Sequence, residues 1–249
     1  MKRYFLADAH LKDPRDLNYR HLLGFLRSLE EEPCELFLLG DIFEFWMGYR
    51  HTLFAVYVPL LEQLRRLREQ GTEIVFVEGN HDFRMGPYFT KTLGCTVFPR
   101  EGLLERDGRR IHISHGDLVD EEDFPYRLLR AFLRCAPFYA AFSVFPPDWA
   151  WEIARWAGRR SRKKRAAREK RWDPENLLRR HARRRFAQGA DLVITGHFHF
   201  PWLEESEEET ILALGDWISQ FSYAILDEGK ITLTSYPTEE ENRPLSNSY

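Results

Sequence analysis

Five short polar clusters, each placed where an apolar run ends, constrain this chain more than any other feature. They read Asp8-Ala9-His10, Gly40-Asp41, Gly79-Asn80-His81-Asp82, His115-Gly116-Asp117 and Gly196-His197-Phe198-His199. Asp, Asn and His are the side chains that hold hard or borderline divalent metals in proteins. Because five of the nine histidines fall in these clusters, we expect one shared metal centre rather than scattered single ligands.

The apolar runs between the clusters predict an α/β fold, because strands and helices alternate in the first third of the chain. Strands are expected at 4–7, 36–39, 74–77, 110–114, 191–195, 210–214, 221–226 and 230–236, and helices at 18–31 and 54–70. A strand–helix–strand order gives parallel strands joined by right-handed crossovers. The clusters should then meet at the carboxyl edge of the sheet, where such folds place their sites.

Residues 120–188 interrupt this alternation and are predicted to be helical. Ten aromatic residues fall between Phe124 and Trp156, which is a large number for a small helical segment to bury. We interpret 120–188 as a helical cap inserted beside the metal site, within one domain that spans 1–249. The aromatic residues have two interpretations, either ordinary core packing or an exposed surface for acyl chains and membrane.

The net charge of −3 conceals a strong asymmetry. Residues 155–185 contain 15 lysines and arginines against three acids, a local charge of +12, so the rest of the chain carries −15. A basic segment on an acidic body favours a polyanionic partner, such as phosphate groups or an anionic membrane surface. A solvated helix face is the simpler interpretation. Nucleic acid is disfavoured, because the aromatic residues precede the basic ones instead of alternating with them.

Several other classes of protein lack their signatures here. The sequence has no Gly-rich phosphate loop and no Gly-x-Ser-x-Gly elbow, which argues against nucleotide-cradling and serine-hydrolase functions. The first strand begins within a few residues of Met1, which leaves no room for a cleaved leader. The longest uncharged stretch, 135–147, is too short to span a bilayer. The expected location is therefore the cytoplasm.

The order of the clusters resembles that of the calcineurin-like metallophosphoesterases. The resemblance implies a four-layer αββα sandwich and a site for two divalent ions, often Mn²⁺. Two such ions about 3.5–4 Å apart can clamp a phosphoryl group and activate a water molecule. Carried over residue by residue, the resemblance assigns one ion to Asp8, His10 and His199, the other to Asn80, His115 and His197, and the bridge between them to Asp41.

A narrower resemblance covers most of the chain. Gly40-Asp41-Ile42-Phe43-Glu44-Phe45-Trp46, His115-Gly116-Asp117 followed by a helical insert, and Leu214-Gly215-Asp216-Trp217 are similar to the UDP-2,3-diacylglucosamine diphosphatase family of lipid A biosynthesis. This implies hydrolysis of the pyrophosphate in a nucleotide-linked acylated sugar, giving UMP and 2,3-diacylglucosamine 1-phosphate. It also implies a cap that receives the acyl chains and a location on the cytoplasmic face of the inner membrane.

Three features of the sequence have more than one interpretation. The best-known branch of that family has Arg where this chain has His81, which is expected either to act in catalysis or merely to hydrogen-bond near the metals. The substrate could instead be another nucleotide or a phosphoprotein, and a non-catalytic scaffold is a third possibility. Outside the ligand set, Asp82 is expected to orient a histidine, and His21, His51 and His181 are expected to be solvated.

Overall fold

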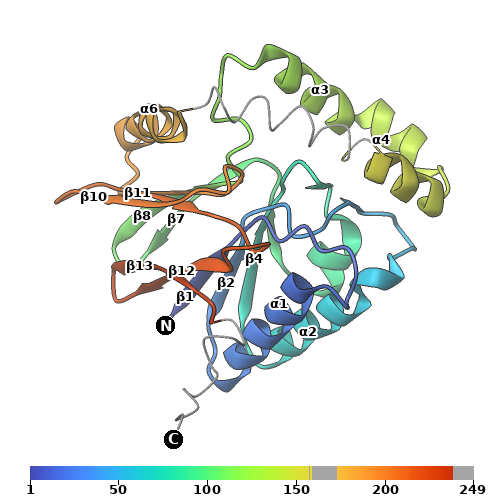
Figure 1. Ribbon diagram of the computed structural model, residues 1–249, viewed down its shortest axis with the longest axis horizontal. Helices are drawn as coiled ribbons and strands as arrows, with labels where there is room; N and C mark the ends of the chain where they lie inside the picture. Colours follow the sequence, from blue (N-terminus) through green and yellow to red (C-terminus); the bar gives the residue numbers. More distant parts are fainter. Residues whose placement is uncertain (157, 159–172, 238–249) are drawn as a thin grey trace, which may run out of the picture.

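A computed structural model gives the arrangement of residues 1–156, 158 and 173–237, and two stacked β-sheets form its centre (Figure 1). The first sheet has the order β13-β12-β1-β2-β4-β6. Its strands are β1 (Arg3–Leu6), β2 (Glu35–Leu38), β4 (Glu73–Val77), β6 (Thr96–Phe98), β12 (Ser222–Asp227) and β13 (Lys230–Ser235). The predicted parallel arrangement is confirmed for β1, β2 and β4, which pair in parallel register.

The second sheet has the order β10-β11-β9-β8-β7. Its strands are β7 (Glu101–Arg106), β8 (Arg109–Ser114), β9 (Leu192–Thr195), β10 (Pro201–Glu205) and β11 (Thr210–Leu214). The sequence did not predict β7 or β10. Both are edge strands rich in charged residues, so they lack the apolar run that identifies a central strand. A small third sheet pairs β3 (Trp46–Met47) with β5 (Asp82–Phe83).

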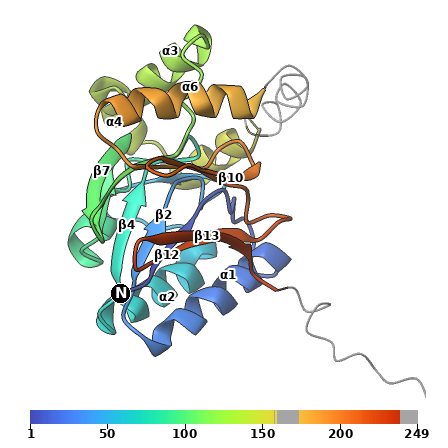
Figure 2. The same ribbon diagram turned by 90° about the vertical axis from the view of Figure 1, so that its left-hand side faces the viewer.

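Helices cover the outer faces of both sheets, which gives the predicted αββα order (Figure 2). The helices are α1 (Leu17–Ser28), α2 (Val58–Glu69), α3 (Phe124–Arg134), α4 (Ala136–Ser143) and α6 (Pro174–Ala187), with short turns at η1 (Leu29–Glu31), η2 (Ala55–Tyr57) and η3 (Tyr88–Thr92). Side chains alternate along β2: Leu36 and Leu38 face α1 and α2, whereas Phe37 packs against the second sheet.

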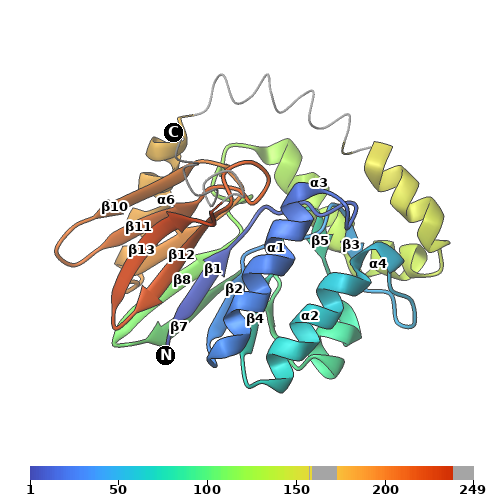
Figure 3. The same ribbon diagram turned by 60° about the horizontal axis from the view of Figure 1, so that its bottom comes forward.

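Helix α6 belongs to the sandwich, although the sequence placed it in the cap range 120–188. Its residues Leu177, Leu178 and Ala182 pack against the outer face of the second sheet. Asp173 caps the helix by accepting a hydrogen bond from the N–H of Asn176 at 3.1 Å. The part of the range that stands away from the sheets is therefore α3, α4 and the helical segment 147–156, which lie together in Figure 3. The basic residues 159–172 lie outside the described residues.

Candidate metal centre

All five polar clusters meet at the carboxyl ends of five strands from both sheets. Asp8 and His10 follow β1, Asp41 follows β2 and Asn80 follows β4 in the first sheet. The second sheet supplies the other three ligand candidates, which are His115 after β8 and the pair His197 and His199 after β9. This convergence was expected from the order of the elements, because parallel strands place their carboxyl ends at one edge.

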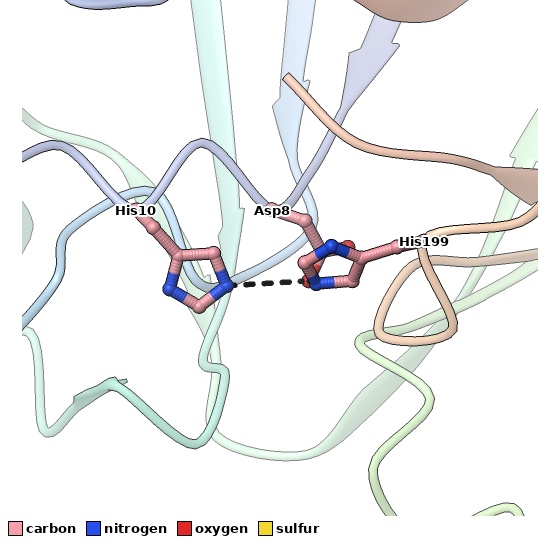
Figure 4. Close-up of side chains that lie close together, drawn as sticks. All are labelled: Asp8, His10 and His199. Carbon is pink, nitrogen blue, oxygen red and sulfur yellow. Dashed lines mark ion pairs between the residues drawn. The ribbon is translucent and has the colours of Figure 1, made fainter. Parts of the chain in front are cut away.

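The seven predicted ligands fall into two adjoining groups. In the first, ligand atoms of Asp8, His10 and His199 lie within 4.8 Å of one another. Figure 4 shows His10 and Asp8 on the chain leaving β1 and His199 reaching them from the loop after β9. In the second group, ligand atoms of Asp41, His115 and His197 satisfy the same limit. Each group offers a mixture of carboxylate and imidazole, which suits a borderline divalent ion.

Asp41 lies between the two groups, where the sequence placed the bridging ligand. Its Oδ2 atom is 3.6 Å from Nε2 of His10 and 3.5 Å from Nε2 of His115. Its Oδ1 atom accepts a hydrogen bond from the backbone N–H of His81 at 2.8 Å, which fixes the orientation of the carboxylate. Asn80 belongs to the second group through Oδ1, which is 3.1 Å from Nε2 of His115.

The unmatched polar atoms of the centre fit a pair of cations. Oδ1 of Asp8 and Nε2 of His10 are buried and have no hydrogen-bond partner among the described residues, an arrangement that is costly without a ligand. Burial and the neighbouring His81 hold the pKa of His10 well below its ordinary value, so its imidazole is neutral and free to bind a metal. The donor set therefore suits two divalent ions.

The protonation of His115 also indicates that the centre suits divalent ions. Burial is the largest single influence on the pKa of His115 and lowers it, but the hydrogen bond to Asp41 and the negative charges of Asp41, Asp8 and Asp117 together outweigh burial and raise the pKa to about 10. The carboxylates therefore attract enough positive charge to keep a proton on a buried imidazole. A divalent ion would supply that charge instead and release the proton, as ligand deprotonation by metals requires.

Five of the seven candidates have a left-handed backbone, which side chains other than glycine adopt rarely. Their φ angles are 55° at Asp8, 44° at His10, 53° at Asp41, 72° at His197 and 51° at His199. Each such residue costs on the order of 1 kcal/mol or more. The sharp turns aim the side chains back across the ends of the strands, a geometry that was not predicted from the sequence.

Buried hydrogen bonds behind the ligands set their orientation. Nδ1 of His115 donates to the carbonyl of Leu39 at 2.9 Å, which leaves Nε2 toward Asp41. Nδ1 of His199 lies 3.5 Å from Oδ2 of Asp216. The sequence motif that contains Asp216 carried the resemblance, but this residue was given no role there. Its position after β11, close to the last candidate ligands, could have indicated that Asp216 orients one of them.

Asp82 has a different role from the expected one. Among the described residues it forms no hydrogen bond with a histidine; its carboxylate accepts hydrogen bonds from four backbone N–H groups. The donors are Asp41 at 2.8 Å, Ile42 at 2.7 Å, Phe43 at 3.3 Å and Gly79 at 2.9 Å. Asp82 therefore ties the turn after β2 to the turn after β4, and it positions ligands through the backbone.

His81 lies at the rim of the centre, beside His10. Their rings meet edge to face with centroids 4.6 Å apart. Because a carbonyl only accepts, the 2.7 Å contact from Nδ1 of His81 to the carbonyl of Glu44 shows that Nδ1 carries a hydrogen. The Nε2 atom is then the one available to a ligand. The sequence did not single out Glu44, whose carboxylate lies 3.8 Å from Nδ1 of His10.

An apolar groove of about 390 Å³ opens directly beside the metal centre. Asn80, His81 and Glu44 line its polar end, and side chains of α3, α4 and the segment 147–156, together with Phe45 and Phe83, line most of the remainder. The apolar walls are Leu129, Leu133, Phe138, Phe142 and Ile153. A ligand in this groove would present a polar group to the histidines and apolar groups to the helices.

With the geometry established, comparisons with known proteins define the class. Residues 1–201 match the sequence profile of the calcineurin-like phosphoesterases, more than half of the chain. The chain belongs to this family and is a hydrolase, as the clusters predicted, and the family implies divalent metals at the centre described above. No helix among the described residues combines the length and apolar character needed to cross a membrane.

Two curated relatives that share one name are similar to this chain over nearly its whole length. The UDP-2,3-diacylglucosamine hydrolase of Porphyromonas gingivalis is 32% identical over 94% of this chain and 97% of its own length. The enzyme of the same name from Neisseria gonorrhoeae is 28% identical over 91% of this chain and 94% of its own. Among solved structures, an archaeal phosphodiesterase is similar with a TM-score of 0.48 and 13% identity, over 94% of this chain and 99% of that one.

Proposed function

We propose that this protein hydrolyses the pyrophosphate of UDP-2,3-diacylglucosamine, giving UMP and 2,3-diacylglucosamine 1-phosphate, with two Mn²⁺ ions held by Asp8, His10, Asp41, Asn80, His115, His197 and His199. The observation that carries the proposal is the apolar groove that begins at the metal ligands. A molecule with a pyrophosphate next to acyl chains matches this change from polar to apolar lining. The names of the two curated relatives support the same substrate.

In the reaction, an oxygen of water adds to the α-phosphorus and the bond from that phosphorus to the bridging oxygen breaks. Bound divalent ions would supply Lewis-acid charge stabilisation and a reactive water. Asp41 and Asp8 hold negative charge at the centre. His10 offers a further ligand atom without adding charge, because its imidazole is neutral. The bridging oxygen leaves on diacylglucosamine 1-phosphate, and UMP retains the oxygen of water.

His81 is placed to assist the leaving group. Its Nδ1–H is held by the carbonyl of Glu44 at 2.7 Å, and the residue lines the groove next to Asn80. When protonated, its Nε2–H would donate to the departing phosphate oxygen, a contribution of about 100-fold for a positioned acid or donor. His81→Arg should keep much of this contribution, because Arg also donates to phosphate, whereas His81→Leu should lose it.

Helix α3 presents apolar residues on two faces, which fits a cap that works at a lipid surface. Leu129 and Leu133 face the groove, whereas Phe124, Leu128 and Phe132 recur at every fourth position and are 74%, 75% and 58% exposed. Trp149 adds a further exposed aromatic, at 66%. We propose that this face docks on an anionic membrane, on the cytoplasmic face of the inner membrane, and that the basic run contributes there.

The substrate is tested by incubating the purified chain with UDP-2,3-diacylglucosamine and Mn²⁺ and following UMP by chromatography. UMP release that stops on chelation and resumes with added Mn²⁺ is the expected result. Absence of UMP, together with hydrolysis of small phosphodiesters, would favour the second candidate, a phosphodiesterase or phosphatase for another nucleotide or a phosphoprotein. The presence of His81 is the observation that favours this candidate.

Membrane docking has its own test. Sedimentation with vesicles that contain phosphatidylglycerol should carry down the wild type and leave Leu128→Ser with Phe132→Ser in the supernatant. Leu103→Ser is the matched control, because Leu103 is 54% exposed on the edge strand β7, away from the cap. Equal sedimentation of the double variant and the control would contradict the docking surface.

A further inference from the structure

A second cavity, of about 330 Å³, lies next to the groove and shares Arg130 with it. Its walls come from the start of β7, the end of β8, the loop before α3, α3 itself and α6. The lining residues that carry the argument are Arg100, Ser114, Arg127, Arg130, His181 and Arg185. None of them is among the predicted metal ligands, so the mechanism above leaves this cavity without a function.

Four buried polar atoms in residues of this lining lack a partner, and one of them is Nε of the partly exposed Arg185. Arg130, Ser114 and His181 are 5%, 6% and 8% exposed. Nη2 of Arg130, Oγ of Ser114 and Nε2 of His181 form no hydrogen bond with any described residue. Buried polar groups in native proteins are almost always satisfied by protein, water or a ligand. Four unmatched atoms, on residues of three different elements that all line one cavity, indicate that the cavity holds a polar ligand.

The charge of the lining determines which sign of ligand fits. The acids in the wall are already neutralised: Asp117 accepts from Nε of Arg130 at 2.5 Å, Glu101 pairs with Arg185 at 2.8 Å, and Glu121 pairs with Arg184 of α6. Arg100 and Arg127 line the cavity and form no ion pair with a described residue, although Nη1 of Arg127 donates to the carbonyl of Leu118 at 3.2 Å. The excess charge is therefore positive, which favours an anion and disfavours a second metal.

We infer that this cavity is a binding site for a phosphoryl dianion, separate from the metal centre. The guanidinium of Arg130 donates from Nη2, the hydroxyl of Ser114 donates from Oγ, and Arg127 and Arg100 supply further charge. Tetrahedral oxyanions accept several such donors at once, and arginine forks match their geometry. The volume admits inorganic phosphate or the phosphate end of a nucleoside monophosphate.

His181 contributes as a neutral donor. Burial, together with Arg185 and His112, lowers the pKa of His181 to about 3, so the ring carries one hydrogen at neutral pH. Placed on Nε2, that hydrogen would point at the bound anion without adding a charge to a site that already has several arginines. The site does not depend on the identity of the substrate, because its lining residues differ from the predicted metal ligands and inorganic phosphate is enough to test it.

Titration calorimetry with inorganic phosphate, on the metal-loaded full chain, tests the site. Wild type is compared with the double variant Arg100→Gln/Arg127→Gln and with the control Arg20→Gln, an exposed arginine on α1. The metal centre is common to all three proteins, so its own affinity for phosphate cancels. The double variant should lose one bound phosphate per chain or bind it at least tenfold more weakly, and the control should match wild type.

A neutral variant separates a built site from general attraction. Ser114→Ala leaves the charge unchanged and should weaken phosphate binding about fivefold, as expected for one lost hydrogen bond of about 1 kcal/mol. Repeating the titration with uridine monophosphate distinguishes the two sources of the phosphoryl group: competition with phosphate at this site indicates a nucleotide, and binding of phosphate alone indicates the free ion. Identical stoichiometry and affinity in wild type and the double variant would overturn the inference.

Discussion

The ends of the strands and the cap differ in how firmly the fold holds them. Asp8, Asp41 and His115 are each no more than 1% exposed, and backbone hydrogen bonds lock the turns that carry them. In α3, by contrast, Arg130 is the one buried residue, and α4 buries none. The proposed chemistry therefore rests on the sandwich, whereas the proposed choice of substrate rests on helices that bury few of their residues.

The largest expected effect comes from removing the proposed bridge in the rigid region. Asp41→Ala should lower kcat by on the order of 1,000-fold on every substrate, because both groups of ligands lose their shared carboxylate. Initial rates on a chromogenic phosphodiester and on the nucleotide lipid measure this, with bound metal determined alongside. Asp16→Ala is the control, since Asp16 precedes α1 and its side chain makes no capping hydrogen bond. Selective loss on one substrate would contradict a common centre.

Trp151 tests where the cap meets the sandwich. It packs against Phe54 and Tyr57, with ring centroids 5.2 and 5.6 Å away. Trp151→Ala should therefore lower the free energy of unfolding by about 3 kcal/mol, measured by urea titration. The sequence placed this residue and Trp149 in one aromatic run, which was interpreted either as core packing or as a surface for acyl chains and membrane. A variant with unchanged stability would place Trp151 in the weakly held region instead.

The dependence of the free energy of unfolding on pH tests whether α6 belongs to the rigid region. Burial, followed by the charge of Arg185, lowers the pKa of His112 to about 4, and the pKa of His181 on α6 is about 3. Between these values and the unfolded pKa near 6.5, the unfolded chain holds more protons, so stability falls as the pH falls. At pH 5 each histidine should cost roughly 2 kcal/mol relative to pH 7.

Urea unfolding at both pH values measures this loss. The double variant His112→Gln/His181→Gln should show a much flatter dependence of stability on pH. Glu101 and Glu121 also face His181 and oppose the shift, but they do not reverse it. If the wild type kept its stability to pH 4, α6 would be only loosely packed on the second sheet.

The smallest effect is expected at the exposed end of the cap. Trp149 is 66% exposed, so Trp149→Ala should leave the free energy of unfolding within about 0.5 kcal/mol of wild type. Turnover of the lipid substrate in vesicles should fall about tenfold, as expected for lost interfacial burial, and turnover of a soluble diester should not change. Equal losses on both substrates would refute the distinction between the two regions.

The central strands and the polar clusters that follow them were predicted from the sequence, whereas the packing of the outer helix α6 and of single histidines was not. Strands with uninterrupted apolar runs, such as β2 and β4, were predicted because both of their faces are buried. The arginine-rich α6 appeared solvated, since only a few residues such as Leu177 and Ala182 face the sheet. His21 and His181 were expected in solvent and are buried, at 7% and 8% exposure; tertiary packing, which no local pattern reports, decides such cases.

The left-handed turns at Asp8, His10, Asp41, His197 and His199 have a consequence for how such a protein would evolve. Glycine adopts that backbone without strain. A gene copy released from selection for catalysis would gain stability by drifting toward glycine at these positions, on the order of 1 kcal/mol wherever the lost side chain made few contacts. An enzyme that uses these residues as metal ligands keeps them although glycine would be more stable there, a trade-off between activity and stability concentrated in a few turns.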